Sequence, residues 1–300
     1  MTDEILEYIP WCKSWTERMA ILDATRGYAK NSSKILQKYE GELSDDLKSV
    51  KNCIDVWDKP EIPLNVGEAG TWYRLLWFYF TKNNIKREII KEGTLKGREV
   101  CNNSEIVDSK KWPPERLLTL DDGTTQFATA AYLCGDERIV KDIIYYTPKY
   151  EKLHMTYESV PYWNEKIKNN EPWEMRKDKT IERQVRAYLQ YLKTGHMVFV
   201  PRHSEDYCFA KIFNTMPPEL ENSFTSVKKH ESDRTKINDA IEEARIYHKT
   251  SSKDHRIITN LVLDYLAKGI DLHVEHPENI SKAWPKYQFD GLVKYAMKSF

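Results

Sequence analysis

The sequence predicts an α/β protein divided into two lobes. Its 300 residues are enough for two domains of ordinary size, each with its own apolar core. Apolar runs with helical spacing repeatedly follow small polar residues or glycine, and short β-branched or aromatic stretches lie between those runs. This alternation of helical and extended segments is typical of repeated strand–helix units.

Four apolar runs are predicted to be helices because each follows a residue type that starts helices. The starts are marked by Lys13, Gly70, Thr124 and Asp178, which are 57, 54 and 54 positions apart. A spacing of about 55 residues indicates an internal repeat. Taken one at a time, each junction is also explained as an ordinary helix cap. The apolar runs are residues 19–22, 73–80, 127–133 and 185–192.

Two stretches between the helical runs are predicted to be strands. Residues 139–147 and 197–200 are rich in β-branched and aromatic side chains, which favour extended backbone. Pro148 and Pro201 follow these stretches and are typical turn residues. We therefore expect these segments to be strands.

Composition excludes several classes of function. The 46 Lys and Arg residues balance the 46 Asp and Glu residues, so no overall positive field would attract nucleic acid. The five cysteines are scattered and form no C-x-x-C pair, which is typical of reduced thiols and gives no zinc signature. We expect neither a nucleic-acid partner nor a bound metal.

The chain is predicted to be a cytoplasmic protein. Residues 1–5 are acidic where a signal peptide would be basic. The most apolar run, residues 72–80, is far shorter than the roughly 20 residues that a membrane-spanning helix needs. We therefore expect no membrane partner.

Three polar clusters in the last third of the chain indicate a site for anions. They are residues 230–234 (HESDR), 252–256 (SKDHR) and 281–285 (SKAWP), and each opens a run with helical spacing. A helix N-terminus has unpaired backbone N–H groups and a partial positive charge. Ser, Lys and Arg placed there can hold a phosphate or a carboxylate.

The order and spacing of these clusters resemble the C-terminal signature of the enolpyruvyl transferases, in particular the 5-enolpyruvylshikimate-3-phosphate synthases. The resemblance extends to residues 13–18, which match the family's Lys-Ser-x-x-x-Arg, and to residues 124–126, where Thr-Thr-Gln stands for Ser-Ser-Gln. Residues 68–74 resemble the family's Asn-Ala-Gly-Thr turn and the arginine of the following helix. Arg98 resembles the arginine that follows a glycine-containing loop.

The resemblance implies a two-lobed enolpyruvyl transferase fold, an inside-out α/β barrel built from repeated βαβαββ units and shortened in this chain. Lobe one would comprise residues 1–10 and 176–300, and lobe two residues 11–175. The active site would lie in the cleft between the lobes, which would close on the ligand.

The resemblance also implies a reaction. The enolpyruvyl group of phosphoenolpyruvate (PEP) would be transferred to a hydroxyl of shikimate 3-phosphate, or of a related anionic cyclic acceptor, with release of phosphate. No cofactor is implied, the partners would be small-molecule substrates, and we expect a monomer.

The resemblance assigns roles to individual residues. Those implied in catalysis are Lys13, His230, Glu231 and His255. Those implied in substrate binding are Ser14, Arg18, Gly70, Arg98, Thr124, Thr125, Gln126, Tyr150, Arg234, Arg256 and Lys282. The six cations among them would hold two anionic substrates side by side.

The chain departs from the family pattern mainly on the acceptor side. His230 replaces a lysine, Glu68 replaces an asparagine, and the family's aspartate after a Val-Pro step is missing. Glu205 or Asp206 would replace that aspartate only with a local rearrangement. Two alternatives therefore stay open: a transferase for an unfamiliar acceptor, and a non-catalytic protein that binds an anionic metabolite. A transferase for a nucleotide sugar is less favoured, because its reactive-loop cysteine has no counterpart here.

Overall fold

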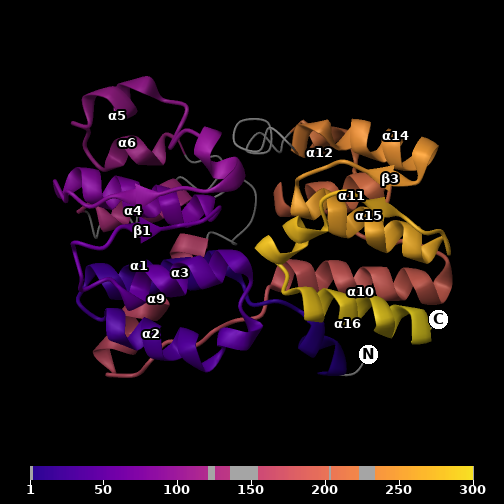
Figure 1. Cartoon of the computed structure of the whole chain (residues 1–300), viewed down its shortest axis with the longest axis horizontal. Helices are drawn as coiled ribbons and strands as arrows, with labels where there is room; N and C mark the ends of the chain where they lie inside the picture. Colours follow the sequence, from indigo (N-terminus) through magenta and orange to yellow (C-terminus); the bar gives the residue numbers. More distant parts are fainter. Residues whose placement is uncertain (1–2, 121–125, 136–154, 203, 223–233, 300) are drawn as a thin grey trace. The chain divides into compact units, whose positions relative to one another are not determined.

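The computed structural model describes residues 3–120, 126–135, 155–202, 204–222 and 234–299 (Figure 1). The chain forms two compact units. The continuous unit is Trp11–Arg176, and the split unit combines Met1–Pro10 with Lys177–Phe300. These limits differ by one residue from the predicted lobe boundaries, while the cleft between lobes stays a prediction.

The continuous unit consists mainly of helices, with one pair of very short strands. Its elements are α1 (Lys13–Thr25), α2 (Ala29–Lys38), η2 (Glu40–Glu42), α3 (Asp45–Asp55), β1 (Leu64–Asn65), α4 (Gly70–Lys82), β2 (Ile89–Ile90), η3 (Gly93–Gly97), α5 (Ser104–Ser109), α6 (Glu115–Leu118), α7 (Gln126–Leu133) and α9 (Met155–Lys168).

The split unit has a similar composition of elements. They are η1 (Asp3–Tyr8), α10 (Lys179–Thr194), η4 (Ser204–Asp206), α11 (Tyr207–Ile212), α12 (Pro218–Glu221), η5 (Arg234–Lys236), α14 (Ile237–Tyr247), β3 (Lys249–Thr250), α15 (His255–Ala267), β4 (His273–Val274), η6 (Pro277–Lys282) and α16 (Lys286–Ser299).

Helix α1 is the centre of the continuous unit. Ten consecutive residues, from Trp15 to Ala24, are buried, so the helix has no solvent face over most of its length. It packs against α2, α3, α4, α7 and α9. All eight residues of α7 are also buried. The core of this unit therefore forms between helices rather than between a helix layer and a sheet.

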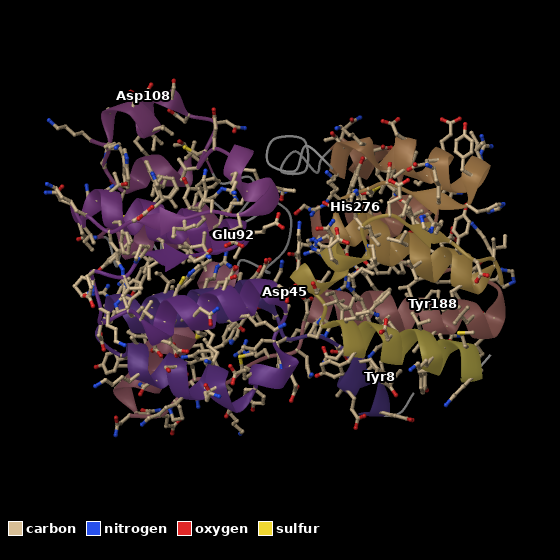
Figure 2. All side chains as sticks on the ribbon, in the orientation of Figure 1. Tyr8, Asp45, Glu92, Asp108, Tyr188 and His276 are labelled. Atoms are coloured by element: carbon tan, nitrogen blue, oxygen red, sulfur yellow. The ribbon has the colours of Figure 1, made fainter. Side chains whose placement is uncertain are left out.

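The core of the split unit joins the two ends of the chain. Tyr8 of η1 lies beside α16 (Figure 2), and its backbone carbonyl accepts a 2.8 Å hydrogen bond from Trp284 Nε1. Gly291 of α16 allows this approach, because a Cβ there would lie 2.8 Å from the Tyr8 ring. The segment before Trp11 is thus held by the C-terminal helix of its own unit.

Both units contain the same small motif, a parallel pair of strands joined by a helix. In the continuous unit the order is β1, α4 and β2, followed by η3; in the split unit it is β3, α15 and β4, followed by η6 (Figure 1). In each case the helix begins six positions after the start of the first strand. The N-termini of α4 and α15 therefore occupy equivalent places in the two motifs.

The predicted fold class is wrong. The four strands in the described part of the chain have two residues each and form two separate two-stranded sheets, so the described structure is not an inside-out α/β barrel. Local chemistry explains why the strands stay short. Pro63 precedes β1 and has no N–H to donate, and Gly67 turns the chain after it with φ of +54°.

Local chemistry on both sides also keeps β3 short. His248 precedes this strand with a left-handed φ of +49°, and the Ser251 N–H after it donates to the Glu243 carboxylate at 2.9 Å. Residues 197–200, predicted to be a strand, are irregular, with Val198 76% and Val200 66% exposed. The other predicted strand, residues 139–147, lies outside the described residues.

The four predicted helices are confirmed as α1, α4, α7 and α10. Asp178 caps α10 as expected, since its Oδ1 accepts the N–H groups of Thr180 and Ile181 at 2.9 and 3.0 Å. In the described part of the chain these four helices do not form the predicted series of strand–helix units, because among them only α4 directly follows a strand. Within the described ranges, no helix combines the length and apolar character needed to cross a bilayer.

Candidate functional site

The N-terminal turns of four helices meet inside the continuous unit, and α1 makes three of the four contacts. Lys13, the first residue of α1, forms a 2.6 Å ion pair through Nζ with Asp46 in the first turn of α3. One turn later, Arg18 donates from Nε to the hydroxyl of Thr129 in α7 at 2.9 Å. These bonds hold α1 level with the starts of α3 and α7.

Helix α4 completes the group. Arg74 donates from Nη1 to Oε1 of Gln126, the first residue of α7, at 3.2 Å, and Glu17 in α1 lies near enough to the N–H of Trp72 for that group to lower the pKa of Glu17. Because all four contacts join first or second turns, the positive ends of four helix dipoles lie close together. We call this group the N-terminal cluster; it comprises residues 13–18, 45–46, 70–74 and 126–129.

Glu17 is a buried carboxylate within the N-terminal cluster. Its side chain belongs to a residue that is 3% exposed, and burial raises its pKa to about 7. Asp46 raises this pKa further, whereas Lys13, Arg18 and the N–H of Trp72 lower it. Glu17 thus brings a buried carboxylate near the start of α4.

Arg18 and Ser14 bind one another along α1. Arg18 is 1% exposed and donates from Nη1 to the backbone carbonyl of Ser14 at 2.7 Å. Thr129, which also accepts from Arg18, shares a 2.6 Å hydroxyl–hydroxyl bond with Thr156 of α9. The Arg18 guanidinium therefore contacts buried core residues as well as residues of the cluster.

The loop after β2 approaches the start of α4. A Cβ on Gly70 would lie 3.4 Å from Arg74 Nη1 and 3.8 Å from Leu95 of η3, and Arg98 follows the end of η3. Glu68, whose charge was expected to disturb an anion site, has a local partner. Its Oε2 accepts the backbone N–H and the hydroxyl of Thr94 at 2.7 and 2.5 Å, which fixes η3.

In the split unit, two of the sequence clusters meet at the start of α15. Arg234, from the HESDR cluster, donates from Nε and Nη2 to Oδ2 of Asp254, from the SKDHR cluster, at 3.2 and 3.1 Å. Oδ1 of Asp254 caps α15 by accepting the N–H groups of Arg256 and Ile257 at 2.8 and 3.3 Å. His255 and Arg256 are the first two residues of that helix.

The charges around Asp254 keep it ionised. Burial alone would raise its pKa, but Arg234, and then His255, lower the pKa well below the usual range. This buried ion pair carries little net stability by itself, since desolvation of both ions offsets their attraction. Its clear effect is to join two segments twenty positions apart in the sequence at one helix end.

Arg256 is paired as well. Its Nη2 lies 3.0 Å from Oε1 of Glu205, and the Asp178 carboxylate that caps α10 is close enough to interact with both. Burial and then Glu205 raise the pKa of Asp178. In this structure the guanidinium therefore faces carboxylates of its own chain.

Asp206 has three donors. It is fully buried and accepts hydrogen bonds from the Arg183 guanidinium, from Gln184 Nε2 at 2.9 Å and from the N–H of Arg202 at 2.8 Å. These bonds join α10 and residue 202 to the end of η4. Glu205, with its contact to Arg256, is the less constrained of the two acids considered from the sequence.

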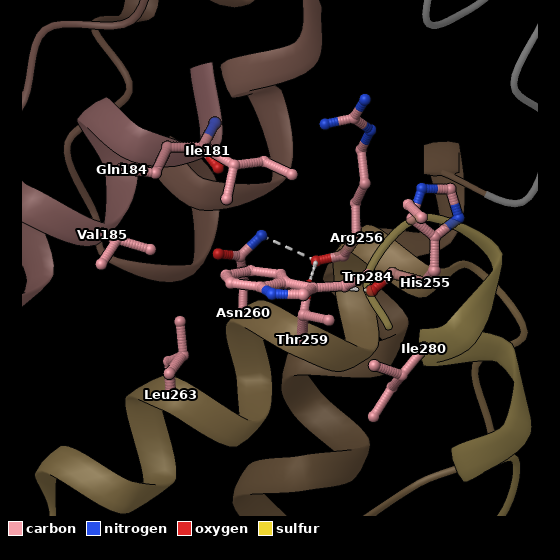
Figure 3. A pocket seen from close by; sticks show the side chains of 11 residues that line it. Ile181, Gln184, Val185, His255, Arg256, Thr259, Asn260, Leu263, Ile280 and Trp284 are labelled. Atoms are coloured by element: carbon pink, nitrogen blue, oxygen red, sulfur yellow. Dashed lines mark hydrogen bonds between the residues drawn. The ribbon is translucent and has the colours of Figure 1, made fainter. Parts of the chain in front are cut away.

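A cavity of about 20 Å³ lies between α10, α15 and η6 (Figure 3). This is room for about one water molecule and far too little for a phosphorylated metabolite. The guanidinium of Arg256 points away from the Trp284 ring (Figure 3), and Lys282 ends η6. The lining residues are Ile181, Gln184, Val185, His255, Arg256, Thr259, Asn260, Leu263, Ile280, Ala283 and Trp284.

The predicted site residues thus fall into three groups. In the continuous unit, Lys13, Ser14, Arg18, Gly70 and Gln126 belong to the N-terminal cluster, and Arg98 follows η3. In the split unit, Arg234, His255 and Arg256 gather at the start of α15, whereas Lys282 ends η6. The remaining predicted residues, Thr124, Thr125, Tyr150, His230 and Glu231, lie outside the described residues.

The sequence analysis missed the acids that pair with these cations. Glu17 stands at an unspecified position of Lys-Ser-x-x-x-Arg, yet a helix places it one turn beyond Lys13. Asp254 was noted only as part of a motif, although an Asp directly before an apolar helical run is a cap signal. Local helix signals would have identified both residues. The pairing of Asp46 with Lys13, by contrast, depends on tertiary packing.

Two buried thiols and the possible metal ligands were also considered as parts of a site. Burial raises the pKa of Cys53 to about 11 and of Cys134 to about 12, so both stay protonated and unreactive near neutral pH. Among the residues that the structure describes, no three His, Cys, Asp or Glu side chains are grouped so that they could hold a metal ion.

Comparison of the chain with models of known protein families, with curated proteins and with solved structures finds no match.

Proposed function

We propose that this protein binds a small anion that carries phosphate and carboxylate groups. The observation that carries the proposal is the N-terminal cluster, in which four helix ends and the side chains of Lys13, Arg18 and Arg74 come together. Helix N-termini and fixed cations are the elements that proteins use to hold phosphate and carboxylate. The start of α15, with Arg234 and Arg256, offers the same chemistry in the split unit.

We further propose enolpyruvyl transfer from PEP as the reaction, on the resemblance of the motifs. The hydroxyl oxygen of an anionic cyclic acceptor, such as shikimate 3-phosphate, bonds to C2 of PEP while C3 takes up a proton. The C2–O bond to phosphate then breaks and C3 loses a proton, which forms the C2=C3 double bond of the enol ether product. The hydroxyl proton of the acceptor leaves through a base and ends on the released phosphate.

The cations have a defined task in this reaction. Negative charge shifts to the departing phosphate, so donors that are fixed in advance lower the barrier. Among the four residues implied in catalysis, Lys13 and His255 are described, and both have side chains of a kind that can move a proton. The reaction does not depend on the outer sheets of a barrel, since these groups lie on first turns of helices.

A non-catalytic binding protein is the second candidate. It is favoured by one specific observation: Arg234 and Arg256 are already paired with Asp254 and Glu205. A ligand must compete with these internal carboxylates, and this competition lowers the affinity of the two arginines for a reacting phosphate.

One experiment separates the two candidates. The purified full chain is incubated with PEP and a panel of hydroxylated cyclic acids and their phosphates, and released phosphate is measured. Release that depends on both PEP and one acceptor supports the transferase. Binding of PEP in calorimetry without phosphate release on any acceptor supports the binding protein. Absence of both contradicts the proposed anion site.

A matched pair of variants assigns the effect to the site. Arg256→Ala removes a cation at the start of α15, and Lys177→Ala removes a cation from the segment before α10. We expect PEP to raise the melting temperature of wild type and of Lys177→Ala, and to do so much less for Arg256→Ala. Equal shifts in both variants would contradict the assignment of Arg256.

A further inference from the structure

Residues 196–202 form an extended segment between α10 and η4. Gly195 ends α10 with a φ of +71°, and the following residues up to position 202 contain no turn or bend. Side chains along the segment alternate, because Phe199 is 8% exposed whereas Val198 and Val200 are 76% and 66% exposed. This period of two is typical of a β-strand with one face on a core. The segment thus has the side-chain pattern of a strand, although no described strand pairs with it.

The buried face of the segment is held in place. The Phe199 and Phe209 ring centroids lie 4.6 Å apart, and the Arg183 guanidinium lies 4.7 Å from the Phe199 centroid. Met197 packs against the same core of the split unit. Because these contacts fix the segment in advance, pairing with another strand costs little of its conformational freedom.

The two backbone edges of the segment differ, and the even-numbered edge is bonded to the protein itself. In an extended segment the N–H and C=O groups of even-numbered and odd-numbered positions point to opposite edges. The Val200 carbonyl accepts a hydrogen bond from Arg183 Nη1 at 2.9 Å, and the Arg202 N–H donates to Asp206 Oδ2 at 2.8 Å. This edge therefore faces α10 and η4.

The odd-numbered edge is open. Its backbone groups belong to Met197, Phe199 and Pro201, and none of them forms a hydrogen bond with a described residue. Proline has no N–H, so the edge offers the N–H groups of Met197 and Phe199 and the carbonyls of all three residues. A row of unpaired donors and acceptors beside exposed apolar side chains is a template for an added strand.

The charges along the segment indicate what kind of strand fits. Residues 193–202 include Lys193, His196 and Arg202, all exposed, and no acidic residue. A second copy of the segment, pairing antiparallel about Phe199, would bring basic side chains against basic side chains at both ends. Like charges opposite one another destabilise a strand pair, whereas opposite charges stabilise it. The complementary strand is therefore apolar in its middle and acidic at its ends.

We propose that residues 197–201 are a docking edge for an extended acidic peptide segment of another protein, which adds to the split unit as a strand. Backbone hydrogen bonds to Met197 and Phe199 hold the peptide, as in other cases of strand addition. Its β-branched side chains pack beside Val198 and Val200, and its terminal carboxylates face the basic groups. This inference stands apart from the proposed anion site.

A synthetic peptide of alternating Thr and Val, with glutamates and blocking groups at both ends, is the probe. Its binding to the full chain is followed by fluorescence anisotropy. One comparison peptide carries lysines in place of the glutamates, and another has its internal amides N-methylated, which removes the donors of a strand without changing the side chains. We expect the lysine peptide to bind about tenfold more weakly and the methylated peptide not to bind.

Variants of the protein locate the binding to the edge. Val198→Asn combined with Val200→Asn removes the cross-strand contacts without adding charge, and it should weaken binding of the glutamate peptide about tenfold. Both positions are exposed, so the fold should tolerate the change. Ile246→Asn is the matched control, because Ile246 is exposed on α14 of the same unit, and it should leave binding unchanged. Arg202→Glu should reduce or reverse the preference for glutamate over lysine ends.

Four outcomes overturn the inference. They are absence of binding of the glutamate peptide, equal binding of the glutamate and lysine peptides, equal binding of the methylated peptide, and equal binding by wild type and the double variant. Sedimentation of the full chain without peptide tests the other occupant of the edge. A dimer that the double variant abolishes would mean that a second copy, and not an acidic peptide, takes this edge.

Discussion

At the scale of single residues, buried carboxylates respond to their surroundings in different ways. Glu17 and Asp254 illustrate two opposite cases. Burial without a close full partner raises the pKa of Glu17, whereas Arg234 lowers that of Asp254. The first group changes charge near neutral pH and the second stays ionised. Only the first can therefore link binding or stability to physiological pH.

Glu17 should make stability depend on pH even without ligand. Its pKa rises from the usual 4.5 to about 7 on folding. Between these values the folded state binds a proton that the unfolded chain does not, so the free energy of unfolding decreases as pH rises from 4.5 through 7. We expect Glu17→Gln to remove this decrease and to be more stable than wild type at pH 8 by about 3 kcal/mol. Urea unfolding at pH 5, 6.5 and 8 measures it, and parallel pH curves for both proteins would contradict it.

Arg87 should stabilise the continuous unit through its shape rather than its charge. Its guanidinium donates to four backbone carbonyls beyond the end of α3, at 2.7 to 2.9 Å. Lysine cannot reproduce this fork. We expect Arg87→Lys to lower the free energy of unfolding by about 1–3 kcal/mol, measured by urea unfolding. Lys86→Ala, at the exposed neighbouring position, should change it little; equal losses would point to a general charge effect. The four carbonyls belong to Val56, Trp57, Lys59 and Ile62.

At the scale of elements, Gly291 decides how η1 packs against α16. Alanine is normally better than glycine inside a helix by about 1 kcal/mol. Here the added Cβ would lie 2.8 Å from two carbons of the Tyr8 ring, and overpacking of this kind costs about 1–3 kcal/mol. We expect the clash to prevail, so Gly291→Ala should lower the melting temperature. Gly291→Ala combined with Tyr8→Leu should recover part of the loss, and no recovery would exclude this contact as the cause.

The starts of helices could be predicted from the sequence, because they depend on local chemistry. Asp178 and Asp254 cap α10 and α15 with their own side chains, and this signal needs only neighbouring residues. Strands could not be predicted in the same way, since a β-branched run such as residues 197–200 becomes a strand only if a partner pairs with it. Here Val198 and Val200 stay exposed and irregular.

The candidate site was predictable to a similar extent. The cations Lys13, Arg18 and Arg234 stand in short motifs that mark helix starts, and the structure brings each of them to such a start. Their acidic partners, such as Asp46 for Lys13, are 20 to 33 positions away and depend on packing. The pairing of these cations with internal carboxylates was therefore invisible in the sequence.

At the scale of the whole molecule, each unit has its own apolar core. Asp23 serves the core of the continuous unit: its carboxylate accepts hydrogen bonds from Trp163 Nε1 at 2.7 Å, Trp173 Nε1 at 2.9 Å and Ser32 Oγ at 2.7 Å. Removing the acceptor leaves three buried donors without it, which costs about 2–4 kcal/mol or more. Gly291 serves the split unit, as described above. The two positions therefore offer a separate perturbation of each core.

This separation predicts how the protein unfolds. Units with separate cores need not unfold in one cooperative step. We expect calorimetry of the full chain to resolve two transitions, with Asp23→Ala lowering the temperature of one and Gly291→Ala lowering the temperature of the other. The variants control for each other, because each should leave one transition in place. A single transition that both variants shift would mean that the two cores unfold as one cooperative unit, and PEP would then stabilise the whole chain rather than the unit that binds it.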